Sequence, residues 1–231
     1  MNLPILDATN ICCEKQDRIL FQDIDLTINS GELVFLRGEN GAGKTSLLRI
    51  LVGLGAQSAM SVSKVTINGH CVKSELNLAG QKLIYCGHKL GFSGLLSAQE
   101  NLQYWMSLSG QGLVKSTHSA EDTKGQAGTD RPNIIIEVLQ ELGLAGLEEV
   151  PVKQLSAGQQ RRVGLAKLWL HKSSNLWVLD EPFTALDTHI VSILEAHITQ
   201  FLKSGGAVLM TSHQQTNIDY PHKTLELEYM W

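Results

Sequence analysis

The chain has 231 residues, of which 43% are hydrophobic, and its formal net charge is −4. This length is sufficient for a buried core, and the acidic balance argues against a protein that binds nucleic acid. No apolar run approaches the roughly 18 to 20 residues that a membrane-spanning helix needs, and the N-terminus does not resemble a signal peptide. We therefore expect a chain that stays in the cytoplasm. Its four cysteines have no metal-binding spacing, so we expect reduced thiols.

Short apolar runs alternate with helical patterns along the chain. Strands are predicted at residues 33–36, 62–67, 83–86, 176–179 and 207–210. A helix is predicted from Lys44 to Leu54, and the region from about 88 to 170 reads as mostly helical. Buried strands that alternate with helices indicate an α/β fold with a mostly parallel sheet. The polar, glycine-containing stretch 110–132 has no apolar periodicity and is interpreted as a mobile surface loop, more simply a tolerated insertion than a functional element.

The strongest motif is a phosphate-binding loop, Gly38-Glu39-Asn40-Gly41-Ala42-Gly43-Lys44-Thr45, which fits G-x-x-x-x-G-K-[ST]. A predicted strand precedes it and a predicted helix follows. Glycines allow backbone N–H groups to surround phosphate oxygens, and the helix N-terminus adds partial positive charge. Lys44 is expected to reach the β and γ phosphates of ATP, and Thr45 to offer its hydroxyl to Mg²⁺. The adjoining Ser46 completes the predicted nucleotide-binding residues.

Asp180 and Glu181 follow the apolar run 176–179 directly. An aspartate at the end of a buried strand is placed to hold Mg²⁺, as in a Walker B motif. Glu181 is a candidate to orient or deprotonate the attacking water. An Asp-Glu pair is by itself common on solvated loops, but a phosphate-binding loop in the same chain reverses that expectation.

Two further candidates are the segment Leu155-Ser156-Ala157-Gly158-Gln159 and His213. Ser156 and Gln159 have the spacing of a helix capping box, and the same helix start could bind a phosphate. His213 follows the predicted strand 207–210. A lone histidine is usually structural. Here, however, the phosphate-binding loop, Asp180-Glu181 and His213 all follow predicted strands, and ligands of open α/β sheets bind at the carboxyl ends of the strands.

Together these motifs resemble the ATPase domains of the ABC (ATP-binding cassette) family. GENGAGKT, LSAGQ, LDEP, Ala185-Leu186-Asp187 and Ser212-His213 occur in the family's order, over nearly the whole chain. The resemblance implies a P-loop cassette with an antiparallel β subdomain. It implies a nucleotide-binding core at 1–87 and 165–231, and a helical subdomain at 88–164.

The resemblance also implies a head-to-tail homodimer that binds ATP and Mg²⁺ between its subunits. Ser156, Gly158 and His213 would then contact the γ-phosphate, and Asp187 would belong to the interface. Two positions depart from the family pattern. His88 stands where a glutamine is usual, and Lys15 stands where an aromatic residue usually stacks on adenine.

Within the family, LSAGQQRRVGLAKLWL, DEPFTALD, TSHQ and Gly87-His88 resemble the ATPase subunits of bacterial cytochrome c maturation systems. That resemblance implies integral membrane partners of the same system, and haem handled by those partners rather than by this chain. It also implies a peripheral position at the cytoplasmic face of the inner membrane. The alternatives are an ABC ATPase for another cargo or a soluble non-transport ABC ATPase. A P-loop kinase or GTPase is disfavoured by the LSAGQ element.

Overall fold

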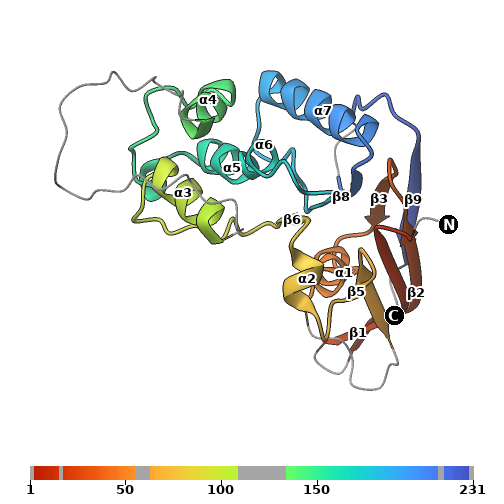
Figure 1. Cartoon of the computed structure of the whole chain (residues 1–231). Coiled ribbons are helices and arrows are strands. Elements are labelled where there is room, and N and C mark those ends of the chain that lie inside the picture. Colours follow the sequence, from red (N-terminus) through yellow and green to blue (C-terminus); the bar gives the residue numbers. More distant parts are fainter. Residues whose placement is uncertain (1–2, 16–17, 56–62, 109–133, 213–215, 229–231) are drawn as a thin grey trace. The chain divides into compact units, whose positions relative to one another are not determined.

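The computed structural model describes residues 3–15, 18–55, 63–108, 134–212 and 216–228, and Figure 1 shows the course of the chain. The chain divides into two compact units. Unit 1 comprises Met1–Leu90 and Ser173–Trp231, and unit 2 comprises Gly91–Lys172. Residues 165–172, which the sequence places in the core, therefore group with the helical unit, and residues 88–90 group with unit 1. The stretch 110–132 lies outside the described residues.

Unit 1 contains a parallel five-stranded sheet in the order β6-β7-β8-β3-β9. Its strands are β3 (Leu33–Gly38), β6 (Leu83–Cys86), β7 (Leu176–Leu179), β8 (Ala207–Thr211) and β9 (His222–Leu227). The strands β7 and β8 are buried along their whole length, as their continuous apolar runs predict. Sequence analysis predicted four of these strands but not β9, whose side chains are mostly exposed and polar.

A second, antiparallel sheet of unit 1 has the order β2-β1-β4-β5. Its strands are β1 (Leu6–Lys15), β2 (Arg18–Ile28), β4 (Lys64–Ile67) and β5 (His70–Cys71), and the short helix α2 (Leu76–Gly80) follows. Of these four strands, the apolar pattern of the sequence predicted only β4. The pairing of β1 with β2 shifts register three times, between Ala8 and Glu14, and each irregularity interrupts the alternation by which a strand is recognised.

Helix α1 (Lys44–Leu51) contributes to the main hydrophobic core of unit 1. Its residues Leu47, Leu48, Ile50 and Leu51 are buried in one cluster with side chains of both sheets, such as Phe21 of β2 and Val178 of β7. The spacing of these leucines and isoleucine places them on one helix face. Because this face is buried, the N-terminus of α1 is held firmly at the end of β3.

Helix α7 (Thr188–Lys203) also packs on the parallel sheet. Trp177 of β7 is buried and stacks on Phe201 of α7, with ring centroids 3.7 Å apart. His197 of the same helix lies 5.2 Å from the Trp177 ring. Asp187 is the N-cap of this helix, and its side chain accepts a hydrogen bond from the backbone N–H of Ile190 at 3.0 Å.

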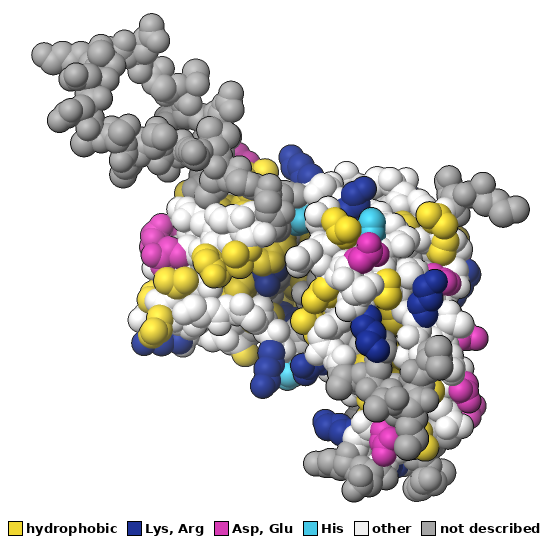
Figure 2. All heavy atoms as spheres, turned by 60° about the horizontal axis from the view of Figure 1, so that its bottom comes forward, with side chains coloured by type: hydrophobic (Ala, Val, Ile, Leu, Met, Phe, Trp, Pro, Cys, Tyr) yellow, Lys and Arg dark blue, Asp and Glu magenta, His cyan; other side chains and the backbone are white. Residues whose placement is uncertain are grey.

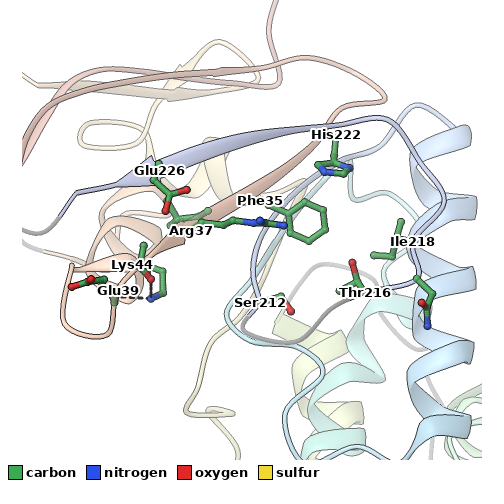
Figure 3. A pocket seen from close by; sticks show the side chains of 12 residues that line it. Phe35, Arg37, Glu39, Lys44, Ser212, Thr216, Ile218, His222 and Glu226 are labelled. Atoms are coloured by element: carbon green, nitrogen blue, oxygen red, sulfur yellow. Dashed lines mark hydrogen bonds between the residues drawn. The ribbon is translucent and has the colours of Figure 1, made fainter.

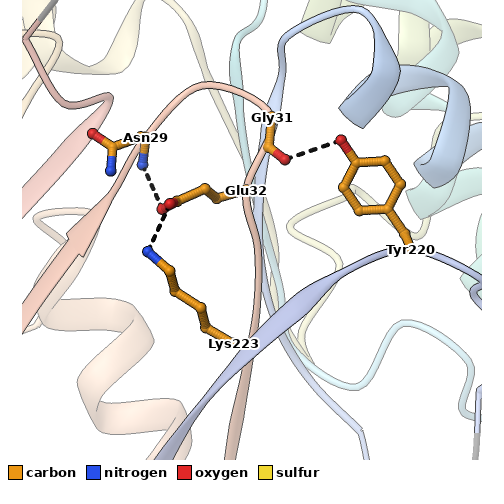
Figure 4. A network of polar contacts seen from close by, with 5 residues as sticks. All are labelled: Asn29, Gly31, Glu32, Tyr220 and Lys223. Carbon is orange, nitrogen blue, oxygen red and sulfur yellow. Dashed lines mark hydrogen bonds and ion pairs between the residues drawn. The ribbon is translucent and has the colours of Figure 1, made fainter.

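A polar network joins β9 to the turn that precedes β3 (Figure 4). Lys223 donates to Glu32 Oε1 at 2.6 Å, and the backbone N–H of Asn29 donates to Glu32 Oε2 at 2.9 Å. The Tyr220 hydroxyl donates to the carbonyl of Gly31 at 3.1 Å. Burial alone would raise the pKa of Glu32, but the hydrogen bonds from Lys223 and Asn29 outweigh it and lower that pKa. The network therefore fixes the edge strand beside β3.

Unit 2 is helical. It contains α3 (Ala98–Leu108), α4 (Ile134–Glu141), the 3₁₀ turn η1 (Val152–Gln154), α5 (Ala157–Leu165) and α6 (Lys167–Leu170). It has a core of its own, to which Leu102, Leu139 and Val163 contribute. Large apolar side chains also remain on its surface, where Figure 2 shows several yellow groups. Among the described residues, no helix is long and apolar enough to cross a membrane.

Candidate functional site

The predicted site residues that belong to the described part of unit 1 lie at the edge of the parallel sheet formed by the carboxyl ends of its strands. Gly38 ends β3, Asp180 follows β7 and Thr211 ends β8. His88 follows β6 by two residues and is exposed, and the backbone N–H of Asp180 donates to the carbonyl of Cys86 at 2.8 Å. Because all these strands run parallel, their carboxyl ends share an edge. The phosphate-binding loop and Asp180-Glu181 therefore follow parallel strands of the same sheet at this edge, while His213, the third motif of the predicted convergence, lies outside the described residues.

The loop between β3 and α1 requires glycine at two positions. Gly38 has φ +142°, and a Cβ placed there would lie 2.5 Å from the carbonyl oxygen of Leu227. Gly43 has φ +96°, and its Cβ would lie 2.9 Å from the Phe21 ring. Any other residue would be both strained and crowded. The loop thus stays close to the sheet and leads directly into the N-terminus of α1, where an anion is stabilised.

Lys44 is folded back onto this loop. Its Nζ donates to the carbonyls of Gly38 at 2.7 Å and Glu39 at 3.0 Å, and the residue is only 9% exposed. The ammonium group is therefore held inside the ring of the loop by neutral acceptors. A phosphate is a stronger, charged partner for the same group, so these bonds can be exchanged when a nucleotide binds.

Two hydroxyl groups bind the carboxylate of Asp180. Thr45 Oγ1 donates to Asp180 Oδ2 at 2.8 Å, and Thr211 Oγ1 donates to Asp180 Oδ1 at 2.9 Å. Asp180 is 3% exposed and Thr211 is fully buried. The pairing of Thr45 with Asp180, predicted as Mg²⁺-holding residues, brings together two hard oxygen atoms of the kind that Mg²⁺ prefers.

Glu181 has an unusual backbone conformation. Its φ is +49°, a left-handed value that is costly for a residue with a side chain. Its backbone N–H donates to Thr211 Oγ1 at 2.8 Å, and its carboxylate accepts from the Thr184 hydroxyl at 3.3 Å. Sequence analysis did not select Thr211. A hydroxyl at the end of an otherwise apolar buried strand was the signal that could have identified it.

A cavity of about 590 Å³ opens beside the phosphate-binding loop (Figure 3). Gly38, Glu39 and Lys44 line one part of it, and Ser212 lies at the end of β8. Further lining residues come from β3, from β9 and from the segment that joins β8 to β9: Phe35, Leu36, Arg37, Thr216, Asn217, Ile218, His222 and Glu226. The predicted catalytic His213 lies outside the described residues, so its role stays a prediction.

A second, smaller cavity of about 250 Å³ lies beside the start of α1. Lys15 of β1 lines it together with Ser46 and Arg49 of α1, and with Cys13. Burial raises the pKa of the Cys13 thiol, and the charge of Lys15 opposes this only in part. None of the described residues that line this cavity is aromatic. Lys15 and Arg49 bring two cations to the cavity, and Glu14 brings one anion.

The predicted signature residues belong to unit 2 and begin helix α5. Ser156 is its N-cap: Ser156 Oγ accepts from the backbone N–H of Gln159 at 3.2 Å, and Ser156 N–H donates to Gln159 Oε1 at 2.8 Å. The predicted capping box is thus present. Gly158 lies in the first turn of the same helix.

The geometry fits Mg-ATP. The glycine-dependent loop, the reversible bonds of Lys44 and the start of α1 suit the phosphates, while Thr45 and Asp180 would hold the metal ion. These features also occur at the edge of the sheet where a ligand is expected.

Comparison with known proteins agrees with this geometry. The family model "ABC transporter" matches residues 21–184. The chain is 40% identical over 217 residues to the cytochrome c biogenesis ATP-binding export protein CcmA of Vibrio parahaemolyticus, covering 94% of this chain and 96% of that protein. It is also 40% identical over 214 residues to CcmA of Escherichia coli K12, covering 93% and 91%.

Solved structures show the same fold. An ATP-binding subunit of an ABC transporter superposes with a TM-score of 0.78 at 19% identity, covering 97% of this chain and 88% of that one. The ATP-binding cassette MJ0796, a dimer bound to ADP and Pi, gives a TM-score of 0.74 at 21% identity and covers 98% and 97%. The chain, an α/β cassette with a parallel and an antiparallel sheet, therefore belongs to the ABC transporter family of ATP-binding proteins.

Proposed function

We propose that this chain is the Mg-ATP-hydrolysing subunit of a membrane ABC complex that serves the maturation of c-type cytochromes. The observation that supports hydrolysis best is the cluster of Thr45, Asp180 and Glu181 at the start of α1 and the end of β7. The relatives named CcmA, which match over nearly the whole chain, support the cellular role.

In the proposed reaction each residue has a separate task. Lys44 leaves the carbonyls of Gly38 and Glu39 and neutralises the β and γ phosphates. Thr45 and Asp180 would hold Mg²⁺, which would offset the negative charge of the phosphate oxygens. Glu181 would accept a proton from the attacking water as the water oxygen bonds to the γ-phosphorus, while the bond from that phosphorus to the bridging oxygen breaks and ADP leaves. His213 and His88 would contact the γ-phosphate and the water around the metal ion.

Hydrolysis is tested by comparing the wild type with Glu181→Gln, which keeps the size of the side chain and removes the base. We expect turnover to fall by at least about 10²-fold, while ATP still binds. Glu228→Gln, which changes an exposed carboxylate beyond β9, is the matched control and should remain active. Equal turnover of Glu181→Gln and wild type would exclude Glu181 as the base, and an inactive wild-type protein would exclude the ATPase function.

The active form is proposed to be a head-to-tail homodimer. Ser156, Gly158 and Gln159 of one subunit would complete the nucleotide site of the other, with Asp187 at the interface. Two facts support this. Ser156, the N-cap of α5, is exposed to solvent. The N-terminus of a nine-residue helix such as α5 attracts an anion. The Glu181→Gln protein should therefore accumulate as an ATP-bound dimer, which light scattering would detect.

Integral membrane subunits of a cytochrome c maturation system are the proposed partners, at the cytoplasmic face of the bacterial inner membrane. The exposed apolar side chains of unit 2 support a protein partner: Leu95 is 74% exposed, Tyr104 63% and Leu108 69%. Tyr104 and Leu108 also line a cavity of about 180 Å³ in unit 2, with Phe92 and Trp105. Haem would be handled by these partners and not by this chain.

The cellular role is tested by haem staining of denatured gels, which detects only covalently attached haem. A strain that carries Lys44→Ala as its sole copy should lack mature c-type cytochromes. Its b-type cytochromes should remain, because their haem is not covalently bound. Normal covalent haem in this strain would reject the cytochrome c role and leave the ATPase function with another cargo.

A further inference from the structure

The hydroxyl of Thr211 contacts two residues of the candidate site at once. It donates its single proton to Asp180 Oδ1 at 2.9 Å and accepts from the backbone N–H of Glu181 at 2.8 Å. A hydroxyl group has one proton to donate, and the Glu181 N–H can only donate. The direction of both bonds is therefore fixed, and the proton of Thr211 must point to Asp180.

These contacts determine which oxygen of Asp180 is presented to the metal site. With Oδ1 bound by Thr211, Oδ2 is the atom that faces Thr45, at 2.8 Å. The Thr211 bond restricts rotation of the carboxylate about its Cβ–Cγ bond, so its loss would weaken the fixed placement of Oδ2 beside the Thr45 hydroxyl. A bond between a hydroxyl and an ionised carboxylate is among the stronger hydrogen bonds in proteins.

The second contact supports the backbone of Glu181. A left-handed φ of +49° is unfavourable for a residue with a Cβ, so neighbouring groups must stabilise it. The bond from Glu181 N–H to Thr211 Oγ1 is such a contact, and it comes from the adjacent strand β8. The direction in which the Glu181 side chain leaves the main chain therefore depends on Thr211.

Packing alone does not explain a threonine at this position. Residues Ala207–Thr211 are buried throughout, and a fully buried parallel strand usually carries apolar residues. A buried hydroxyl is unfavourable unless it is hydrogen-bonded. Valine has nearly the same shape as threonine and would fill the same space, so the hydroxyl itself is the feature that requires a role.

We propose that Thr211 is a positioning residue that sets both the metal-binding oxygen of Asp180 and the backbone of the general base Glu181. This inference rests on the proposed ATPase function for the role of Glu181. Through these two residues, Thr211 would affect the binding of a divalent cation together with a nucleoside triphosphate.

The test uses three variants that separate the hydroxyl from the methyl group. Thr211→Ser keeps the hydroxyl, Thr211→Val keeps the methyl group, and Thr211→Ala keeps neither. Binding of Mn²⁺ is measured by electron paramagnetic resonance with a non-hydrolysable ATP analogue, and kcat and KM are measured with Mg-ATP. Thr199→Val is the matched control, because its hydroxyl donates to the carbonyl of Glu195 at 2.9 Å on helix α7, outside the site.

We expect Thr211→Ser and Thr199→Val to stay within about twofold of the wild type. Thr211→Val and Thr211→Ala should both weaken Mn²⁺ binding by about tenfold and lower kcat by at least that factor, in the range for one hydrogen bond to a charged group. The KM for ATP should change less, because the phosphate-binding loop is untouched.

Two results would overturn the proposal. One is wild-type Mn²⁺ affinity in Thr211→Val and Thr211→Ala. The other is a loss of Mn²⁺ affinity and kcat in Thr211→Ser and Thr211→Ala but not in Thr211→Val, which would assign the effect to packing of the methyl group. If thermal unfolding shows that Thr211→Val does not fold, the proposal is decided by comparing Mn²⁺ affinity and kcat in Thr211→Ser and Thr211→Ala. If the wild type binds Mn²⁺ but does not hydrolyse ATP, the proposed function fails, while the Mn²⁺ affinities still decide the role of Thr211.

Discussion

Substitution of Ser156 separates its structural role from its proposed role in binding phosphate. Ser156 Oγ accepts from Gln159 N–H at 3.2 Å as the N-cap of α5. Aspartate caps a helix about as well as serine, and its charge suits a helix N-terminus. Ser156→Asp should therefore unfold at the wild-type temperature. Ser156→Ala should lose about 1 kcal/mol, which for a chain of this size lowers the midpoint by about 2–4 °C.

For the ATP-bound dimer we expect the reverse order: Ser156→Asp should weaken it more than Ser156→Ala does. In the proposed dimer the Ser156 side chain faces the γ-phosphate of the other subunit. A carboxylate about 4 Å from one phosphate charge is repelled by about 4 kcal/mol at an effective dielectric constant of about 20. That energy corresponds to a factor of roughly 10³ per nucleotide site, and because the proposed homodimer contains two such sites, the dimer should weaken by at least about 10³-fold. Ser156→Ala removes one hydrogen bond per site and should weaken the dimer by about tenfold or less per site.

Light scattering in a Glu181→Gln background, with and without ATP, measures the dimer, and circular dichroism measures thermal stability. Ser97 provides a matched control in unit 2. Ser97 Oγ accepts from the backbone N–H of Glu100 at 3.1 Å, and the backbone N–H of Ser97 donates to Glu100 Oε2 at 2.8 Å, which makes a second capping box at the start of α3. Ser97→Ala should lose stability and keep the dimer. A Ser156→Asp protein that dimerises with ATP like the wild type would show that Ser156 is only a cap.

Four further outcomes are expected. Lys44→Ala should lose useful Mg-ATP binding in a nucleotide titration, and wild-type affinity would contradict the role of Lys44. Because the family resemblance places Lys15 where an aromatic residue usually stacks on adenine, competition assays should show weak discrimination between ATP and GTP, and a strong preference for ATP would mean that another group reads the base. His88→Gln should keep more ATPase activity than His88→Ala, and a fully active His88→Ala would make this residue a bystander. Burial lowers the pKa of His171 below its usual 6.5, so the unfolded chain binds a proton more readily. The free energy of unfolding should therefore fall as the pH drops below about 6.5, and it should fall less steeply in His171→Phe. Denaturant unfolding at a series of pH values measures this, and equal pH dependence in the two proteins would refute it.

The order and spacing of short motifs were sufficient to predict much of this protein. The phosphate-binding loop, the Asp180-Glu181 pair and the capping box of Ser156 each depend on residues adjacent in the chain, and their local chemistry can be read directly. Continuous apolar runs identified the strands β3, β6, β7 and β8 for the same reason. Strands β1 and β2 were not predicted, because register shifts interrupt their alternation.

Only the tertiary structure decided how distant residues meet. Thr211 lies 31 residues from Asp180 in sequence, and nothing local to β8 indicates that its hydroxyl binds the carboxylate of one residue and the backbone of the next. That contact exists because β7 and β8 are neighbours in the parallel sheet, with Leu179 opposite Met210. The left-handed backbone of Glu181 likewise depends on contacts from another strand. The sequence alone therefore determined which chemical groups are present, and the pairing of strands determined how they are oriented toward one another.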